Sequence, residues 1–126
     1  MLFLRRRQGE AIAIFDARVE VWVKVLEIDV DAVTALLEIT GYDDPVELRP
    51  GDTVPILQGE GNLRLDLIQE IDGERASYCN LGLSTPRSLN IYRGELLRGT
   101  TREQRRGMVR TLNYRTRGAP GNTSFP

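Results

Sequence analysis

The sequence predicts a mainly β protein with an α-helix near its C-terminus. Apolar and polar residues alternate along several stretches, a period typical of strands that bury one face. Glycine, proline and aspartate recur between these stretches and indicate turns. After residue 93 the pattern becomes typical of helices. The 126 residues match the size of one domain and are enough to bury a hydrophobic core.

Five strands are expected in the first part of the chain. A short apolar start meets a turn signal at Gln8-Gly9. In the expected strand at residues 19–28, valines at every second position from Val19 to Val25 make one face uniformly apolar. Aspartates then indicate a turn, and Pro45 precedes a short strand. The expected strands are residues 1–7, 11–15, 19–28, 32–40 and 46–49.

Four further strands are expected after a break at Pro50-Gly51-Asp52. Leucines alternate with polar residues from Leu63 onward, and Asp72-Gly73 is a strong hairpin signal. Pro86 separates the last two stretches. The expected strands are residues 53–57, 63–71, 76–83 and 88–92.

Two helical segments are expected after the last strand, at residues 94–98 and 101–112. Thr100 is suited to cap the second helix, because Glu103 three residues later completes a capping box. Few apolar residues follow. We therefore divide the chain into a β domain at residues 1–98, a basic helix at 99–113 and a disordered tail at 114–126.

The residue types exclude several kinds of chemistry. The chain has one cysteine and no histidine, so it cannot build an internal disulfide, a Cys/His zinc site or a histidine-activated nucleophile. We expect no enzyme activity, no metal and no cofactor. No apolar run approaches the ~20 residues of a membrane helix, and the first residues do not resemble a signal peptide. A cytoplasmic location without membrane contact is expected.

Charge is segregated along the chain, although the net charge is only −1. Residues 1–26 carry +2, residues 27–74 carry −11 and residues 75–126 carry +8. All but one of the basic residues are arginine, whose planar donor fork matches phosphates and base edges. Solubility and genomic base composition also favour arginine, so this bias alone leaves nucleic-acid binding open.

A weak internal repeat relates residues 21–50 to residues 65–93. Both contain a long strand, an aspartate turn, a return strand and a proline break. Both then end in a short strand with a terminal arginine, Arg49 in the first and Arg93 in the second. A duplicated unit and an ordinary succession of hairpins both explain this pattern.

Two stretches far apart in the chain carry a resemblance to a known family. The chain opens with apolar residues at positions 2 and 4, basic residues at 6 and 7, Gly-Glu at 9 and 10, and then alternating isoleucines. Residues 81–96 read Leu-Gly-Leu-Ser-Thr-Pro-Arg-Ser-Leu-Asn-Ile-Tyr-Arg-Gly-Glu-Leu. In both stretches the sequence resembles the carbon storage regulator family (CsrA and RsmA), small bacterial RNA-binding proteins. Together with residues 65–73, the resemblance covers about half of the chain.

The resemblance implies a CsrA-like fold of strand-exchanged β-sheets. In this fold, the first strand of one protomer lies beside the last strand of the other. It also implies a post-transcriptional regulator that binds GGA-containing loops of messenger or small RNA along this edge and controls translation or message stability. Carried over by position, the expected RNA-binding residues are Leu4, Arg5, Arg6, Arg7, Ile91, Tyr92 and Arg93.

The chain departs from the family in several places. Ordinary members are about half as long, so residues 29–62 are extra, and the residues from 99 onward have no counterpart. Arg5 replaces a small polar residue, and Tyr92 stands where a histidine is usual. Tyr92 is expected either to stack on a base or to pack on the C-terminal helix.

Two explanations of the extra segment stay open. In the first, the chain is a fused pseudo-dimer with unequal halves, residues 1–50 and 53–98, that acts as a monomer. In the second, a single unit carries an inserted acidic hairpin and forms a homodimer. The acidic middle segment favours fusion, because it would repel RNA from one of the two faces.

An alternative function is a protein-interaction module or antagonist that associates with CsrA-type proteins without binding RNA. A basic C-terminal element is expected either to extend the RNA footprint or to form a solvated helix face. Its members are Arg98, Arg102, Arg105, Arg106, Arg110, Arg115 and Arg117.

Overall fold

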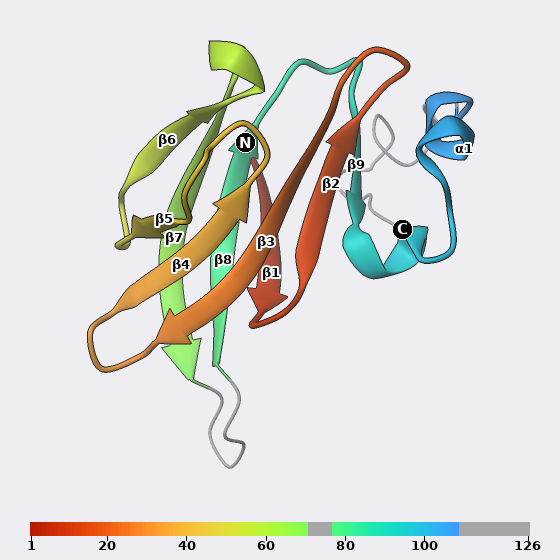
Figure 1. Ribbon diagram of the computed structural model, residues 1–126. Coiled ribbons are helices and arrows are strands. Elements are labelled where there is room, and N and C mark those ends of the chain that lie inside the picture. Colours follow the sequence, from red (N-terminus) through yellow and green to blue (C-terminus); the bar gives the residue numbers. More distant parts are fainter. Residues whose placement is uncertain (71–76, 109–126) are drawn as a thin grey trace.

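The computed structural model describes residues 1–70 and 77–108, which form two antiparallel sheets (Figure 1). Within a sheet, neighbouring strands are often distant in sequence. The four-stranded sheet has the order β1 (Leu2–Arg7), β8 (Ser77–Ser84), β7 (Gly61–Glu70) and β6 (Thr53–Ile56). The five-stranded sheet has the order β5 (Val46–Leu48), β4 (Thr34–Ile39), β3 (Glu20–Asp29), β2 (Ala11–Phe15) and β9 (Asn90–Arg93).

The mainly β class is confirmed, and each expected strand is present with ends that differ by at most two residues. β6 ends at Ile56 because Leu57 and Gln58 adopt left-handed backbone angles, with φ of 55° and 54°. These residues belong to the short 3₁₀ turn η1 (Leu57–Gly59), which leads into β7. The expected turn at Asp72-Gly73 lies outside the described residues.

The core lies between the two sheets, because their alternating residues point toward each other. Val21, Val23 and Val25 are buried on β3, as the valine alternation predicts, and Leu63 and Leu65 are buried on β7. Each such side chain contributes about 1.5–3 kcal/mol when it is fully buried. Burial in this shared core stabilises the packing of the five-stranded sheet on the four-stranded sheet.

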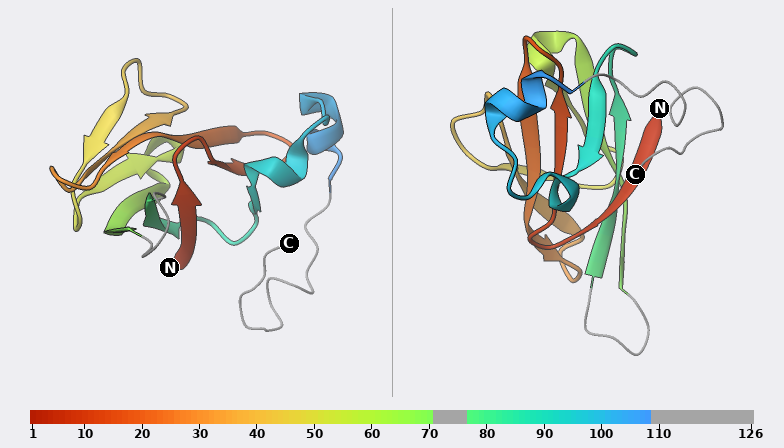
Figure 2. Two further views of the ribbon diagram at one scale, coloured as in Figure 1. Left: turned by 90° about the horizontal axis from the view of Figure 1, so that it is seen from below. Right: turned by 90° about the vertical axis from the view of Figure 1, so that its right-hand side faces the viewer.

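The C-terminal helices are shorter than expected. A 3₁₀ turn, η2 (Gly94–Leu97), follows β9, and α1 (Arg102–Arg106) lies on the side of β2 and β9 (Figure 2). The capping box is formed by Thr101 and Gln104, not by Thr100 and Glu103. The Thr100 hydroxyl instead donates a 2.6 Å hydrogen bond to the Leu97 carbonyl, so it closes η2 and the next threonine caps α1. The expected helical residues 109–113 and the tail 114–126 lie outside the described residues.

The helices within residues 1–70 and 77–108 include none that is long and apolar enough to cross a membrane.

Candidate nucleic-acid interface

The two segments that carry the family resemblance meet in space. β1 is an edge strand of the four-stranded sheet, where it pairs with β8, and β9 is an edge strand of the five-stranded sheet, where it pairs with β2. An ion pair connects these edges, because Arg6 Nη1 on β1 donates to Glu95 Oε1 just after β9 at 2.8 Å. β1 and β9 thus lie in different sheets and do not pair with each other, contrary to the expected placement of the first strand beside the last, and the ion pair runs from β1 to the turn after β9.

Arg6 is buried at this junction, with 4% of its surface exposed. Besides Glu95, its guanidinium donates to the backbone carbonyls of Arg5 at 2.7 Å and Ala11 at 3.2 Å. The hydrogen bond from Arg6 lowers the pKa of Glu95, although burial opposes this shift. Arg6 therefore joins β1 to the segment after β9, and its side chain is not displayed on the surface.

The other expected RNA-binding residues divide into buried and accessible groups. Leu4 and Ile91 are buried in the core between the sheets, so only their backbone groups face the sheet edges. The side chains of Arg5 and Arg7 are exposed, and Arg93 is half-buried. RNA contact by these residues stays a prediction. Arg5, Arg7 and Arg93 are accessible enough for their side chains to take part in it.

Arg93 carries an unusual donor. Its Nε–H is buried and has no hydrogen-bond partner among the described residues. Leaving a buried donor without a partner costs about 1–3 kcal/mol. The buried Nε–H is closed to solvent, so contact with RNA would use the part of the half-buried Arg93 side chain that solvent reaches.

Tyr92 takes part in packing on the outer face of the five-stranded sheet. Its ring lies 5.6 Å from that of Phe15, with an angle of 47° between the ring planes. The surrounding cluster also contains Leu97 and Met108 from the C-terminal segment. This is the packing role that was one of the two expectations for Tyr92.

Three arginines of the C-terminal element are engaged within the protein. Arg105 and Arg102 form ion pairs with Glu20 at 2.7 and 3.1 Å, and Arg106 donates to the Ala17 carbonyl at 3.3 Å. The hydrogen bond from Arg105 is the largest cause that lowers the pKa of Glu20 to about 2. These contacts attach α1 to the start of β3. Sequence reasoning missed Glu20, because nothing in the local pattern links it to residues more than eighty positions away.

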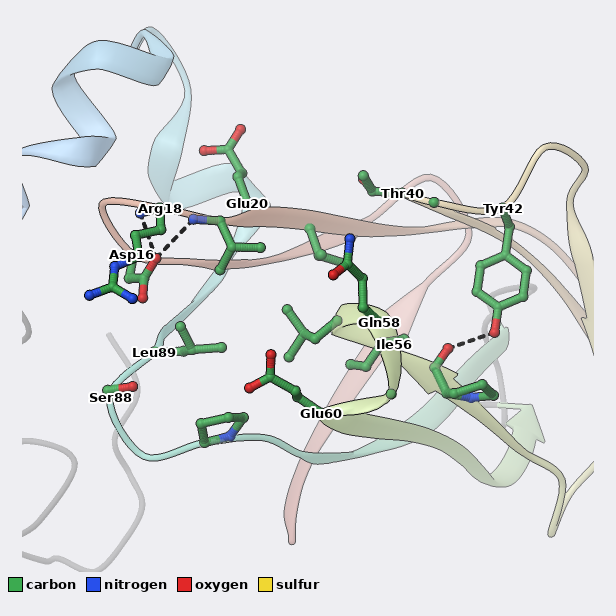
Figure 3. A pocket seen from close by; sticks show the side chains of 17 residues that line it. Asp16, Arg18, Glu20, Thr40, Tyr42, Ile56, Gln58, Glu60, Ser88 and Leu89 are labelled. Carbon is green, nitrogen blue, oxygen red and sulfur yellow. Dashed lines mark hydrogen bonds between the residues drawn. The ribbon is translucent and has the colours of Figure 1, made fainter.

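A cavity of about 870 Å³ opens at the ends of β3, β4 and β6 (Figure 3). The Tyr42 hydroxyl crosses toward β6 and donates a 2.6 Å hydrogen bond to the Pro55 carbonyl. Asp16 at the rim accepts the backbone N–H groups of Arg18 and Val19, and Glu20 is paired as described above. Both carboxylates therefore accept hydrogen bonds from neighbouring groups of the protein.

The described part of the chain contains no group of three histidine, cysteine, aspartate or glutamate residues placed to hold a metal ion. Cys79 is buried within β8, and this burial raises the pKa of its thiol to about 11. Its thiol is therefore protonated at neutral pH and has little nucleophilic character.

Comparisons of the chain with protein-family models, with curated proteins and with solved structures find no match.

Proposed function

We propose that the protein is a sequence-specific RNA-binding regulator that recognises GGA-containing loops at the junction of β1 and β9. The observation that carries this proposal is the Arg6–Glu95 ion pair, which connects the first strand to the turn after the last strand and so brings the two family-like segments together. Single-stranded loops expose base edges to protein donors and acceptors. Arg93 and Arg7 supply guanidinium groups that pair with guanine O6 and N7 or with phosphate.

We further propose that the fold is a strand-exchanged dimer fused into one chain. β1 belongs to the first half of the sequence but pairs with β8 of the second half. β9 belongs to the second half but pairs with β2 of the first half. Each sheet thus has an outer strand from the opposite half, which supports an exchange within a single chain.

Repeated backbone contacts support a duplicated unit. Gly9 N–H donates to the Val25 carbonyl at 2.7 Å, and Gly51 N–H donates to the Leu65 carbonyl at the same distance. Both glycines have positive φ, and the pairing register shifts immediately after Val25 in β3 and after Leu65 in β7.

The turn after the first strand of each unit repeats as well. Arg7 N–H donates to the Glu10 carboxylate at 2.7 Å, and Arg49 N–H donates to the Asp52 carboxylate at 2.9 Å. This equivalence matches β1–β4 with β5–β8, so β5 opens the second unit. It supports a boundary between the units just before β5, not after residue 50, and it relates Arg49 to Arg7 and not to Arg93.

The two units provide one RNA site. β9 lies beside β2, whereas β6 is the outer strand of its sheet. Pro55 on β6 has no N–H, and Tyr42 occupies its carbonyl. A strand cannot continue the sheet at this residue. We infer a monomer with one site per chain.

The test is a binding titration with a GGA hairpin and a GCA control hairpin. We expect the GGA hairpin to bind at least about tenfold more tightly, the order of discrimination supplied by one good bidentate contact. Equal affinities for the two hairpins would overturn sequence-specific recognition. Equal affinities combined with stable binding to a CsrA-type protein would favour the interaction module.

A mixing experiment tests the single-chain site. Arg7→Ala and Arg93→Ala chains are each impaired, and mixing them restores no binding if both residues act in one monomer. Recovery of binding on mixing, together with a dimeric mass in solution, would overturn the fused monomer.

A further inference from the structure

The outward face of the four-stranded sheet carries flat and basic groups beside the proposed site. Register places residues of β1, β8 and β7 in rows across this face. The rows are Phe3–Gly82–Arg64, Arg5–Asn80–Leu67 and Arg7–Tyr78–Gln69. These rows contain three arginines, and the acidic Asp66 lies beside them in β7, at the bulge between Leu65 and Leu67.

Phe3 is exposed on this face, with 50% of its surface accessible to solvent. Its ring rests over Gly82, because a Cβ atom at residue 82 would lie 2.9 Å from Phe3 Cε1 and 2.6 Å from Met1 Sδ. Glycine therefore lets the ring settle against the backbone of β8 while half of its surface faces solvent. An aromatic ring supported in this way offers a stacking surface without a change of backbone.

Arg5 provides a second flat group on the same face. Its guanidinium carbon lies 4.1 Å from the centre of the Tyr78 ring. The Tyr78 hydroxyl donates a 2.6 Å hydrogen bond to Gln69, which fixes the ring beneath the guanidinium. Residues two apart on a strand project from the same face about 6.6 Å apart, so Phe3 and Arg5 form adjacent platforms.

We propose that this face binds the single-stranded nucleotides that flank the GGA hairpin, with bases on Phe3 and Arg5 and phosphate near Arg64. Aromatic rings and guanidinium planes are the side-chain groups on which unpaired bases stack. The occupant is RNA and not a second copy of the chain, because two faces carrying arginines repel each other, whereas a polyanion is attracted. The inference rests on the proposed function and extends its RNA footprint.

The experiment compares the GGA hairpin with the same hairpin extended by single-stranded nucleotides, on the 5′ side and on the 3′ side separately. Wild-type protein is expected to bind one extended hairpin about tenfold more tightly, the effect of stacking one or two bases. Phe3→Ser abolishes this gain and leaves the affinity for the unextended hairpin within about twofold. Val33→Ser removes a comparably exposed apolar side chain from the β3–β4 turn and keeps the gain.

Arg64→Gln tests the phosphate contact on the same RNAs. It is expected to reduce the salt dependence of the extended hairpin by about 0.7 in logarithmic slope, the value for one phosphate on a single strand. Arg87→Gln, a change at an exposed arginine in the loop between β8 and β9, leaves the slope unchanged. The proposal is overturned if the extended hairpin binds no better than the unextended hairpin. It is also overturned if Phe3→Ser keeps the gain in affinity.

Failure of this inference is distinguishable from failure of the proposed function. If GGA and GCA hairpins bind equally, the proposed recognition fails, and a short unstructured oligoribonucleotide without GGA then tests the face alone. If the Phe3→Ser variant no longer binds this oligoribonucleotide, the face is still an RNA-binding surface. If Phe3→Ser instead converts a dimer into a monomer and leaves RNA affinity unchanged, the face is a contact between copies and the proposal is wrong.

Discussion

The turn between β1 and β2 and the turn between β5 and β6 are built alike, but the surroundings of these two regions differ. In both, an arginine N–H donates to a carboxylate three residues later, across a glycine with positive φ. Around the first turn, Arg6 reaches Glu95 beyond β9, whereas near the second, Tyr42 covers the carbonyl of Pro55 on the outer strand β6. Two similar turns are thus followed by differently covered sheet edges. The segment packed beside each edge makes the difference: η2 with Glu95 at the first, and the loop after β4 with Tyr42 at the second.

The largest expected difference between the two regions concerns stability. Arg6→Ala should lower the free energy of unfolding by about 2–4 kcal/mol, because it leaves buried acceptors and Glu95 without their partner. Arg49→Ala, at an exposed position before the second turn, should cost less than about 0.5 kcal/mol. Urea unfolding monitored by circular dichroism measures both. Equal losses would contradict the structural role assigned to Arg6.

The next difference concerns RNA affinity. Arg93→Ala should weaken binding of the GGA hairpin by about 1–3 kcal/mol without unfolding the protein, the value of a good bidentate contact. Arg7→Ala should also weaken binding, whereas Arg49→Ala at the equivalent turn should leave it unchanged. Fluorescence anisotropy at one fixed salt concentration measures these affinities. A loss in Arg49→Ala as large as that in Arg7→Ala would mean that both edges bind RNA.

A smaller effect is expected from acid pH, which should release α1 from the β2–β9 side and leave the rest of the protein folded. Glu20 has a pKa of about 2 against an ordinary value of 4.5, so its contribution to docking is complete above pH 4.5 and is lost as the pH falls through about 2. Trp22 reports this contact, because its Nε1 donates to Glu20 at 2.9 Å and Arg105 lies 5.5 Å from the centre of its ring.

Trp22 fluorescence is therefore expected to titrate in this acid range while circular dichroism shows the sheets intact. Glu20→Gln should remove the titration and lower stability by about 1–2 kcal/mol at neutral pH. Arg102→Gln should leave the salt dependence of RNA binding unchanged, because Arg102 is assigned to docking. A fluorescence titration that persists in Glu20→Gln would assign the signal to another group.

The smallest expected effect lies at the closed edge. Tyr42→Phe removes the hydrogen bond to Pro55 and should cost about 0.5–1.5 kcal/mol of stability. Restoring a donor with Pro55→Val in the same chain should promote self-association through β6, since unpaired strand edges recruit partners. Analytical ultracentrifugation over a concentration series detects this. A double variant that stays monomeric at every concentration would mean that other features close this edge.

The candidate site was only partly predictable from the sequence. The motifs located β1 and β9, but alternation alone did not reveal that Leu4 and Ile91 face the core at these edges or that Arg6 is buried with them. Glu20 and Tyr78 escaped notice because their partners, Arg105 and Arg5, lie on elements far from them in sequence. The sequence suggested the repeat that we propose, but with another boundary between the units. A short strand ending in arginine looks the same whether it closes one unit or opens the next.

The sequence by itself determined the strands, because alternation with a period of two and turn residues are local properties of the chain. It therefore predicted the buried valines of β3 and the break at Pro50-Gly51-Asp52. Only the tertiary structure decided that β1 pairs with β8 and β9 with β2. It also decided that Thr101 and not Thr100 caps α1, because the preceding turn already uses Thr100. Which edge a strand joins depends on register and on packing between distant segments, and no local pattern contains that information.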